Sequence, residues 1–472
     1  MRQYINVTRN GNDIYHKFID ENGNRVARIE KFHPTLFLKD KTKTSTTRSM
    51  VGKVQVRELI FNGINDYSAE VKKYKDIGGF GVYGEINPVY QFINAKYPDK
   101  IDFDFKKMKT IWVDIETAYD PGIFPEPQFA KYAILTISCY DSLKDEYIIF
   151  HHNPKGYHND NALVMECDDE KDMLTSFLDY WKLDDYPDNV VGWNSEKFDL
   201  PYIYNRIKKV LSAKDARSLS PIYKVYAKTK QDKKFFKDYL SVNIQGINHL
   251  DMMEFYEKFT WDTRVSYSLD NVAFEEMGSR KIDYSEYGNL MNLFRENFDL
   301  YCTYNLRDVS LMVEINDKIK LFDLVLQIAY FSKINLVDTL SPVKTWDVVT
   351  YNYIKEDGLV LEPNLFHDSE EYGGGYVMDP KPGMYKDIIS IDAKSEYPNL
   401  VRWLNIGNET IRDTDNGNCT KSTAGYYFDK SEQSVYSKMI TDVFDRRVAT
   451  KKIMKQKKIE LAEIRRLINE KT

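Results

Sequence analysis

The sequence predicts a mixed α/β protein of several domains, and three observations support this. The chain has 472 residues, too many for one hydrophobic core, so two to four domains are expected. Hydrophobic residues make up 42% of the chain and aromatic residues 14%, which is enough to build sizeable cores and to exclude global disorder. Short strand-like runs alternate with stretches of helical periodicity along most of the sequence.

The order of predicted elements between residues 108 and 329 defines a central domain. Strand-like runs joined by short polar connections favour an antiparallel meander at residues 109–117, 132–140 and 146–152. A helix is predicted next, because apolar residues recur at helical spacing from 174 to 181, after three acids. Residues 189–193 form a short buried strand ahead of further helices. This order is the outline of a ribonuclease-H-like domain.

The chain on either side of this domain, and two segments within it, carry patterns of their own. Residues 1–107 alternate short apolar runs with turns and predict an N-terminal α+β domain, to which the chain returns at about 330–370. A lysine-rich stretch with aromatic residues at 226–242 predicts an exposed hairpin, and residues 296–318 predict a periodic helix. From Met439 onward the pattern is that of one long helix.

Charge and cysteine content narrow the class of protein. The net charge of −6 argues mildly against a nucleic-acid binder, but Arg446 to Thr472 holds ten Lys and Arg against three Glu, so this segment carries +7 and the rest −13. The 4 cysteines form no Cys-x-x-Cys pair, so neither a disulfide framework nor a zinc site is expected. The N-terminus lacks the apolar core of a signal peptide, and acidic and polar residues interrupt the most apolar helical stretch at 321–331. We expect an intracellular protein without a membrane span.

Asp114 and Glu116 are the most informative residues of the sequence. Residues two apart in a strand project from the same face, so the two carboxylates lie side by side and repel each other. A divalent cation between them removes this repulsion, since Mg²⁺ and Mn²⁺ prefer oxygen ligands. Apolar residues at 111, 113 and 115 fill the opposite face. The alternative interpretation is an edge strand that carries solvated acids.

Two later acids and one tyrosine extend this set. Asp199 lies just past the predicted strand at 189–193, and Asp308 lies one helical turn after Tyr304. Two divalent ions about 4 Å apart need roughly this many carboxylates, and such a pair activates water and stabilises a leaving alkoxide. Each residue also has a plain structural interpretation: Asp199 as a helix cap, Tyr304 and Asp308 as a satisfied side-chain pair.

In this order, the motifs resemble the three exonuclease motifs of family B DNA polymerases. They are Asp-Ile-Glu at 114–116, Asn-x-x-x-Phe-Asp at 194–199 and Tyr-x-x-x-Asp at 304–308. The chain is similar to the branch of T-even-type bacteriophages, which it also matches at residues 19–23, 34–37, 192–194, 322–326 and 341–347. The resemblance extends over the whole chain. It implies an exonuclease domain at 108–329, a partial palm at 371–430 and a truncated first fingers helix at 431–472.

The resemblance also implies roles for the exonuclease residues. Two Mg²⁺ or Mn²⁺ ions per active site are expected, held by Asp114, Glu116, Asp199 and Asp308. Tyr304 would position the attacking water in a 3′→5′ proofreading reaction. The hairpin at 226–242 occupies the place of the strand-separating hairpin of the family.

Residues 391–398, Ile-Asp-Ala-Lys-Ser-Glu-Tyr-Pro, resemble motif A of the polymerase site. By this resemblance Asp392 and the Ala393 carbonyl bind the catalytic metals. Tyr397 packs beneath the sugar of the incoming deoxynucleoside triphosphate, and Ser395 belongs to the same nucleotide site. Glu396 stands where the family has Leu, which leaves the detail of nucleotide selection open. The alternative interpretation is a capped strand end.

Two further matches concern DNA and nucleotide binding. Tyr372, Gly374 and Gly375 match the Tyr-x-Gly-Gly motif with which family members hold the template strand. Arg447 and Lys451 lie one helical turn apart and match the fingers residues that grip the triphosphate. The alternative for this basic helix is a solvated charged face.

Two polymerase motifs of the family are absent from the 472 residues. These are the fingers motif (motif B), Lys-x-x-x-Asn-Ser-x-Tyr-Gly, and the second palm carboxylate motif (motif C), Asp-Thr-Asp-Ser. Residues 413–416, Asp-Thr-Asp-Asn, lie too close to motif A and are expected to form a surface turn. We therefore expect the N-terminal subunit of a split phage polymerase, whose partner chain carries motifs B and C.

The expected partners follow from this hypothesis. They are primer–template DNA, single-stranded 3′ ends, deoxynucleoside triphosphates, the second polymerase chain and, through that chain, a sliding clamp. The expected location is the cytoplasm of the infected bacterial host. Two alternatives remain open: a free-standing 3′→5′ DNA exonuclease, and a non-catalytic subunit that binds primer–template DNA.

Overall fold

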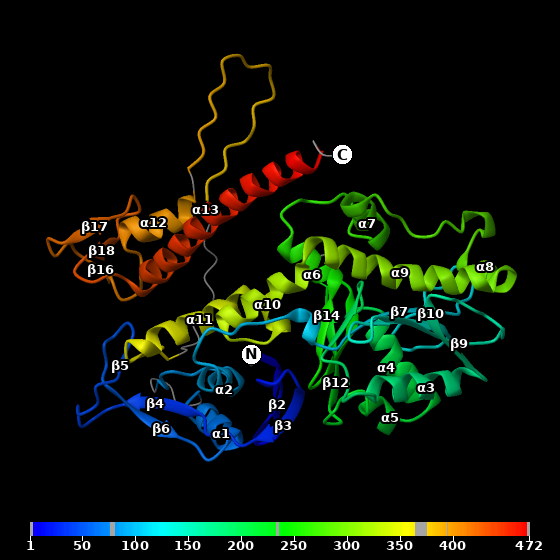
Figure 1. Cartoon of the computed structure of the whole chain (residues 1–472). Coiled ribbons are helices and arrows are strands. Elements are labelled where there is room, and N and C mark those ends of the chain that lie inside the picture. The colour runs from blue at the N-terminus through cyan, green and yellow to red at the C-terminus, as the bar shows by residue number, and fades with distance from the viewer. Residues whose placement is uncertain (1–2, 76–80, 233–235, 364–374, 394, 470–472) are drawn as a thin grey trace. The chain divides into compact units, whose positions relative to one another are not determined.

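The computed structural model of the protein describes residues 3–75, 81–232, 236–363, 375–393 and 395–469 (Figure 1). The chain divides into two compact units. The first comprises Met1–Pro34, Phe61–Ser68 and Ile86–Val349, and the second comprises Thr35–Ile60, Ala69–Glu85 and Thr350–Thr472. Two helices contribute residues to both units, α1 (Ile64–Lys75) and α11 (Pro342–Glu356).

A six-stranded mixed sheet forms the centre of the first unit, in the strand order β10-β9-β8-β7-β11-β14. The strands are β7 (Thr110–Thr117), β8 (Ile134–Asp141), β9 (Glu146–His152), β10 (Ala162–Cys167), β11 (Asn189–Gly192) and β14 (Asn248–Asp251). β7, β8 and β9 are antiparallel neighbours, whereas β10, β11 and β14 join the sheet in parallel. The meander predicted from the sequence is confirmed.

Helices cover both faces of this sheet (Figure 1). The first face carries α3 (Glu170–Lys182), α4 (Asp199–Val210) and α5 (Ala213–Arg217), and the second carries α9 (Phe298–Ile319). Because side chains alternate along a strand, Ile111, Val113 and Ile115 of β7 enter the core beneath α3 and α4. On the second face, Ile149 packs against Leu306 of α9. The predicted helices at 174–181 and 296–318 are confirmed.

An antiparallel N-terminal sheet belongs to the same unit. It contains β1 (Gln3–Asn10), β2 (Asp13–Ile19) and β3 (Arg25–Glu30). Lys17 is fully buried, and its Nζ lies 2.9 Å from Oδ1 of Asp188. Arg25 Nε donates to the other oxygen of Asp188 at 2.8 Å, and the Lys109 amide donates to it at 2.7 Å. This charge cluster fixes the N-terminal sheet to the beginnings of β7 and β11.

The remaining elements of the first unit include a hairpin and five helices. The predicted hairpin is present as β12 (Val225–Gln231) and β13 (Asp238–Ile244), and part of its tip lies outside the described residues. The helices are α2 (Pro88–Lys96), α6 (Met252–Phe259), α7 (Leu269–Met277), α8 (Leu290–Glu296) and α10 (Leu321–Ser332).

The second unit contains small sheets and a long C-terminal helix. β4 (Thr35–Lys39) pairs with β6 (Val56–Ile60), β5 (Arg48–Ser49) pairs with β15 (Leu359–Val360), and β16 (Ile411–Arg412), β17 (Cys419–Lys421) and β18 (Tyr427–Asp429) form a third sheet. α12 (Glu396–Leu404) packs on α13 (Val435–Asn469), where Arg402 Nε donates to Thr441 Oγ1 at 3.1 Å. The long C-terminal helix is confirmed and begins four residues earlier than predicted.

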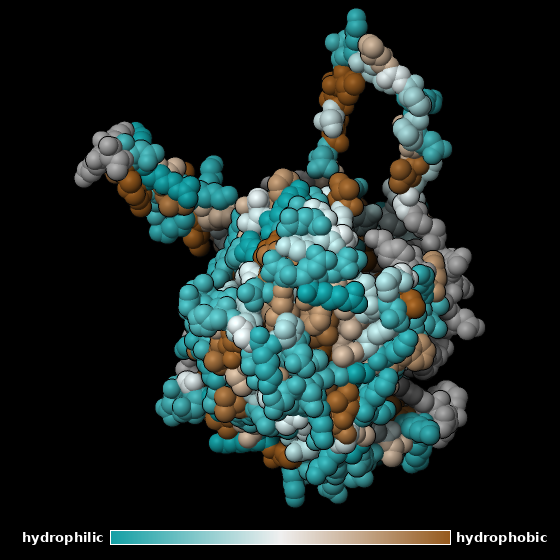
Figure 2. Space-filling view, turned by 90° about the vertical axis from the view of Figure 1, so that its right-hand side faces the viewer, coloured by the Kyte–Doolittle hydropathy of each residue, from teal (hydrophilic) through white to brown (hydrophobic). Residues whose placement is uncertain are grey.

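Residues 375–393 have no helix or strand, and their side chains are exposed (Figure 2). Residues 413–416 form an exposed turn as predicted, in which the Asp415 side chain accepts the Gly417 amide at 2.9 Å. No helix in the described part of the chain combines the length and the hydropathy that crossing a bilayer requires.

Candidate active site

The two acids of β7 lie on the sheet face that α9 covers. Ile111, Val113 and Ile115 point into the opposite core, so the side chains of Asp114 and Glu116 emerge beneath α9. Both acids are half-buried and not solvated at an edge, because β8 and β11 flank β7. The edge-strand interpretation is therefore wrong.

Helix α9 supplies the third acid. Asp308 is 2% exposed, and one of its carboxylate oxygens lies within 4.8 Å of carboxylate oxygens of Asp114 and Glu116. Tyr304 lies one turn earlier on the same helix and is also buried. Acids separated by nearly two hundred residues in the sequence thus meet in one cluster, which we call the carboxylate cluster (Asp114, Glu116 and Asp308).

Asp199 approaches the cluster from the junction of β11 and α4. The residue pairs between β7 and β11 end at Trp112, and beyond them the Ile115 amide donates to Asp199 Oδ1 at 3.3 Å. Asp199 is the first residue of α4, and no side chain caps that helix. The helix-cap interpretation is therefore wrong, and the carboxylate points to the strand that carries the other acids.

A lysine that the sequence patterns did not reveal completes the site. Lys281 Nζ lies 2.5 Å from Asp308 Oδ2 and 3.2 Å from the Tyr304 hydroxyl. Burial alone would lower the pKa of Lys281, but Asp308, Tyr304 and Asp114 together outweigh burial and raise the pKa above its ordinary value. Lys281 therefore stays charged. It lies in the segment between α7 and η2 (Ser285–Tyr287), where no periodicity marks it.

Burial is the largest cause that raises the pKa of each acid in the site. Burial, and then the negative charge of Asp308, raises the pKa of Glu116 to about 8 and that of Asp114 well above its ordinary value. Burial raises the pKa of Asp199 to about 7, although the hydrogen bond from Ile115 opposes this. Burial likewise raises the pKa of Asp308, against the effect of Lys281. The cluster therefore has too little positive charge nearby to hold all its acids ionised.

These residues fit a divalent cation. Asp308 Oδ1 is buried and, within the described residues, has no hydrogen-bond partner. One oxygen from each of Asp114, Glu116 and Asp308 lies within 4.8 Å of the others, and hard divalent cations such as Mg²⁺ and Mn²⁺ take this type of ligand. A bound cation would relieve the repulsion that raises the pKa values.

We expect the metal-free protein to lose stability as the pH rises from about 5 to 8. The raised pKa values mean that the folded state binds more protons in this range than the unfolded state, whose carboxyls titrate near pH 4. Melting temperatures in EDTA should therefore be lower at pH 8 than at pH 6, and Mg²⁺ should raise the melting temperature more at pH 8. In the control variant Glu116→Gln, the difference between the melting temperatures at pH 6 and pH 8 in EDTA should be smaller. Equal melting temperatures with and without Mg²⁺ at pH 8 would contradict the prediction.

We also expect Lys281→Met to destabilise the metal-free protein by about 3 kcal/mol, because removal of one partner leaves the buried Asp308 without its counter-ion. Urea denaturation in EDTA measures this loss. The matched control is Lys344→Met, since the Lys344 ion pair with Asp338 is solvent-exposed on the lysine side and contributes under ~1 kcal/mol. An equal effect of the two substitutions would refute the prediction.

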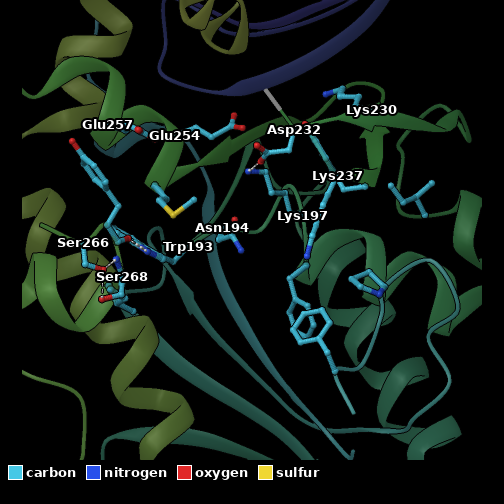
Figure 3. Close-up of a pocket in the computed structure, with 18 of the residues that line it drawn as sticks. Trp193, Asn194, Lys197, Lys230, Asp232, Lys237, Glu254, Glu257, Ser266 and Ser268 are labelled. Carbon is cyan, nitrogen blue, oxygen red and sulfur yellow. Dashed lines mark hydrogen bonds and ion pairs between the residues drawn. The ribbon is translucent and has the colours of Figure 1, made fainter. Parts of the chain in front are cut away.

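A cavity of about 1750 Å³ opens beside Asp114 (Figure 3). Figure 3 shows Trp193 and Asn194 in its centre, with Lys197, Asp232 and Lys237 on one side and Ser266 and Ser268 on the other. The walls carry five cationic side chains (Lys197, Lys230, Lys237, Arg264 and Lys281), seven carboxylates (Asp114, Glu126, Asp232, Asp238, Glu254, Glu257 and Asp270) and aromatic rings that include Phe124, Tyr239 and Tyr267. The aromatic rings suit stacking bases, and the carboxylates would need bound cations beside a phosphate.

The loop between β11 and α4 connects this cavity to Asp199. Asp251 accepts the Asn194 amide at 3.0 Å and the Glu196 amide at 2.9 Å, which fixes the loop. Glu196 in turn accepts from Lys230 of β12 and Ser241 of β13, each at 2.6 Å. The hairpin is thereby held against the loop that places Asp199.

The predicted polymerase residues lie in the second unit. Asp392 and Ala393 are exposed and precede α12, and Tyr397 on α12 is 78% exposed. Arg447 and Lys451 are exposed on α13, and Gly375 is exposed in the segment without secondary structure. Ser395 is half-buried and directly precedes α12. Tyr372 and Gly374 lie outside the described residues.

Comparisons with known proteins agree with this fold and site. A mixed sheet with helices on both faces and acids on its central strand and covering helix defines the ribonuclease-H-like class. A family model described as DNA polymerase family B, exonuclease domain, matches residues 88–272, and a model described as DNA polymerase family B matches residues 316–471. The chain belongs to the family B DNA polymerases. Residues 88–272 lie in the first unit, and residues 316–471 begin near the end of the first unit and continue through the second.

The chain is similar to DNA polymerases of phages and of a eukaryote. The chain is 30% identical to the DNA-directed DNA polymerase of Escherichia phage RB69 over 488 residues, which cover 94% of this chain and 53% of the relative. It is 30% identical to that of Enterobacteria phage T4 over 509 residues, 98% of this chain and 55% of the relative. A DNA polymerase delta catalytic subunit of Candida albicans is 26% identical over 68% of this chain. The chain spans about half the length of the two phage relatives.

Proposed function

We propose that this chain is a 3′→5′ DNA exonuclease that removes nucleotides from single-stranded 3′ ends, and that it carries half of a DNA polymerase site. Asp114, Glu116, Asp199 and Asp308 would hold two Mg²⁺ or Mn²⁺ ions. The observation that carries the proposal is the convergence of three carboxylates within 4.8 Å beside a large cavity that contains aromatic and charged side chains of both signs. Family membership supports the choice of DNA as substrate.

The residues of the site have distinct parts in this reaction. When bound, the cations supply an activated water and stabilise the charge that develops on the leaving oxygen. Tyr304 presents its hydroxyl beside Asp308 and would orient the attacking water. Lys281 donates to the Tyr304 hydroxyl and to Asp308, so it holds both groups in place and contributes positive charge next to the phosphate.

The cavity would hold the last nucleotides of the single strand. Phe124 is 67% exposed at its wall, and an exposed ring provides a stacking surface that is indifferent to base identity. Lys197 and Lys237 would contact the phosphate backbone. The hairpin of β12 and β13 forms part of the same wall, as a strand-separating element would.

For DNA synthesis we propose that Asp392 and Ala393 bind metal, that Ser395, Tyr397, Arg447 and Lys451 bind the nucleotide, and that Tyr372, Gly374 and Gly375 contact DNA. Two-metal nucleotidyl transfer needs a second palm carboxylate, which the 472 residues do not contain. A second polypeptide with motifs B and C would supply it. The exposure of apolar residues in this region supports such a partner: Tyr376 is 91%, Met384 96% and Ile391 92% exposed.

A nuclease assay on the isolated chain tests the exonuclease. With a single strand labelled at its 5′ end, Mg²⁺ should produce a ladder of progressively shorter strands, and EDTA should abolish it. The same strand with a duplexed 3′ end should be trimmed more slowly. Internal cleavage, or no cleavage with either Mg²⁺ or Mn²⁺, would overturn the proposal and favour a non-catalytic DNA-binding subunit.

A further inference from the structure

A buried amide beside the carboxylate cluster has no part in the function described so far. Asn305 follows Tyr304 on α9 and is fully buried. Its Nδ2 donates to Asp114 Oδ2 at 2.6 Å. The contact is short, and it joins a neutral group to a metal-binding carboxylate.

Two hydroxyl groups fix the orientation of this amide. Thr136 Oγ1 and Ser138 Oγ of β8 donate to Asn305 Oδ1 at 3.0 and 2.6 Å. Since both hydroxyls occupy the oxygen side of the amide, the nitrogen side must face Asp114. The opposite orientation would set the amide oxygen against the carboxylate and leave both hydroxyls facing an N–H group.

The sheet register explains why these four residues meet. Thr136 is the cross-strand partner of Glu116, and Ser138 is the partner of Asp114. The hydroxyl residues therefore lie on the same sheet face as the acids, directly under α9, whereas Ile137 and Cys139 enter the opposite core. A hydrogen-bonded row thus runs from β8 through α9 to β7.

We propose that Asn305 is a positioning residue for cation binding, oriented by Thr136 and Ser138. It engages one oxygen of Asp114 and so turns the other towards Glu116 and Asp308. Hydrogen bonds to a ligating carboxylate hold it in the geometry that a cation requires, and the loss of such a partner typically lowers metal affinity by about 10- to 100-fold. The inference rests on the proposed cation site.

Direct Mn²⁺ binding to the full chain tests this inference. Free Mn²⁺ is measured by electron paramagnetic resonance during a titration, without DNA and without turnover. Asn305→Leu should weaken Mn²⁺ binding by about 10-fold or more, and the double variant Thr136→Val with Ser138→Ala should weaken it in the same direction by a smaller factor. At saturating Mn²⁺ the nuclease rate of both variants should return towards that of the wild type.

Asn316→Leu provides the matched control. Asn316 is a buried amide eight residues after Asp308 on the same helix, and its Oδ1 accepts the amide of Phe322 at 3.2 Å and not a group of the carboxylate cluster. It should lower the melting temperature and leave Mn²⁺ affinity unchanged. Unaltered affinity in Asn305→Leu and in the double variant would overturn the inference. No Mn²⁺ uptake by the wild type would instead overturn the proposed cation site itself.

Discussion

Asp114→Ala is expected to reduce the rate of 3′-end removal by at least about 10³-fold. Asp114 belongs to the carboxylate cluster and also lines the cavity, so its loss removes a proposed ligand at the point where we propose that substrate and cations meet. Metal ions contribute several kcal/mol of charge stabilisation in the transition state, and each 1.36 kcal/mol corresponds to a factor of ten in rate. Single-turnover cleavage of a 5′-labelled single strand in saturating Mg²⁺ measures the effect.

Asp179→Ala is the matched control for this substitution. Asp179 is an exposed acid on α3, which covers the opposite face of the same sheet. It should leave the rate within about twofold, as surface substitutions away from a site usually do. If Asp114→Ala retained the rate of the control while folded, the carboxylate cluster would not be the site of hydrolysis.

Asp392→Ala is expected to abolish DNA synthesis and to leave single-strand trimming unchanged. The expected site of synthesis lies in the second unit, and the carboxylate cluster lies entirely in the first. The loss of the carboxylate proposed to bind both metals should again cost on the order of 10³-fold or more. Primer extension by this chain combined with the proposed second chain, together with trimming by this chain alone, separates the two activities.

Asp379→Ala serves as the control for the second substitution. Asp379 is exposed in the same segment of residues 375–393, so its replacement tests whether any change of charge there matters. Extension should persist in this variant. Extension by the Asp392→Ala complex at the wild-type rate would remove Asp392 from the polymerase site and favour a free-standing nuclease.

The elements that build the exonuclease fold were predictable because their signals are local. The alternation in β7, the helical spacing of residues 174–181 and the short strand at 189–193 each depend on a few neighbouring residues. The hairpin and the long C-terminal helix were equally clear. Strand order was less accessible, because the parallel pairs of β11 with β7 and β14 join distant segments.

The acids of the site were predictable because two of them share one strand and the others stand in recognisable motifs. Lys281 and Asn305 were not predicted. Lys281 lies outside any periodic element, and its ion pair with Asp308 arises only when the chain folds back on α9. The sequence contains one weak indication of the contacts that Asn305 makes. The polar residues at 136 and 138 are two apart, as are the acids at 114 and 116 on the neighbouring strand. Only the register of β7 and β8 gives that spacing a meaning.

The central claim is that distant acids bind a pair of divalent cations, and anomalous diffraction tests it most directly. Crystals of the chain grown with Mn²⁺ and a short single strand should show two anomalous peaks within coordination distance of Asp114, Glu116, Asp199 and Asp308. Absence of any peak among these side chains, with the strand visible in the cavity, would contradict the account.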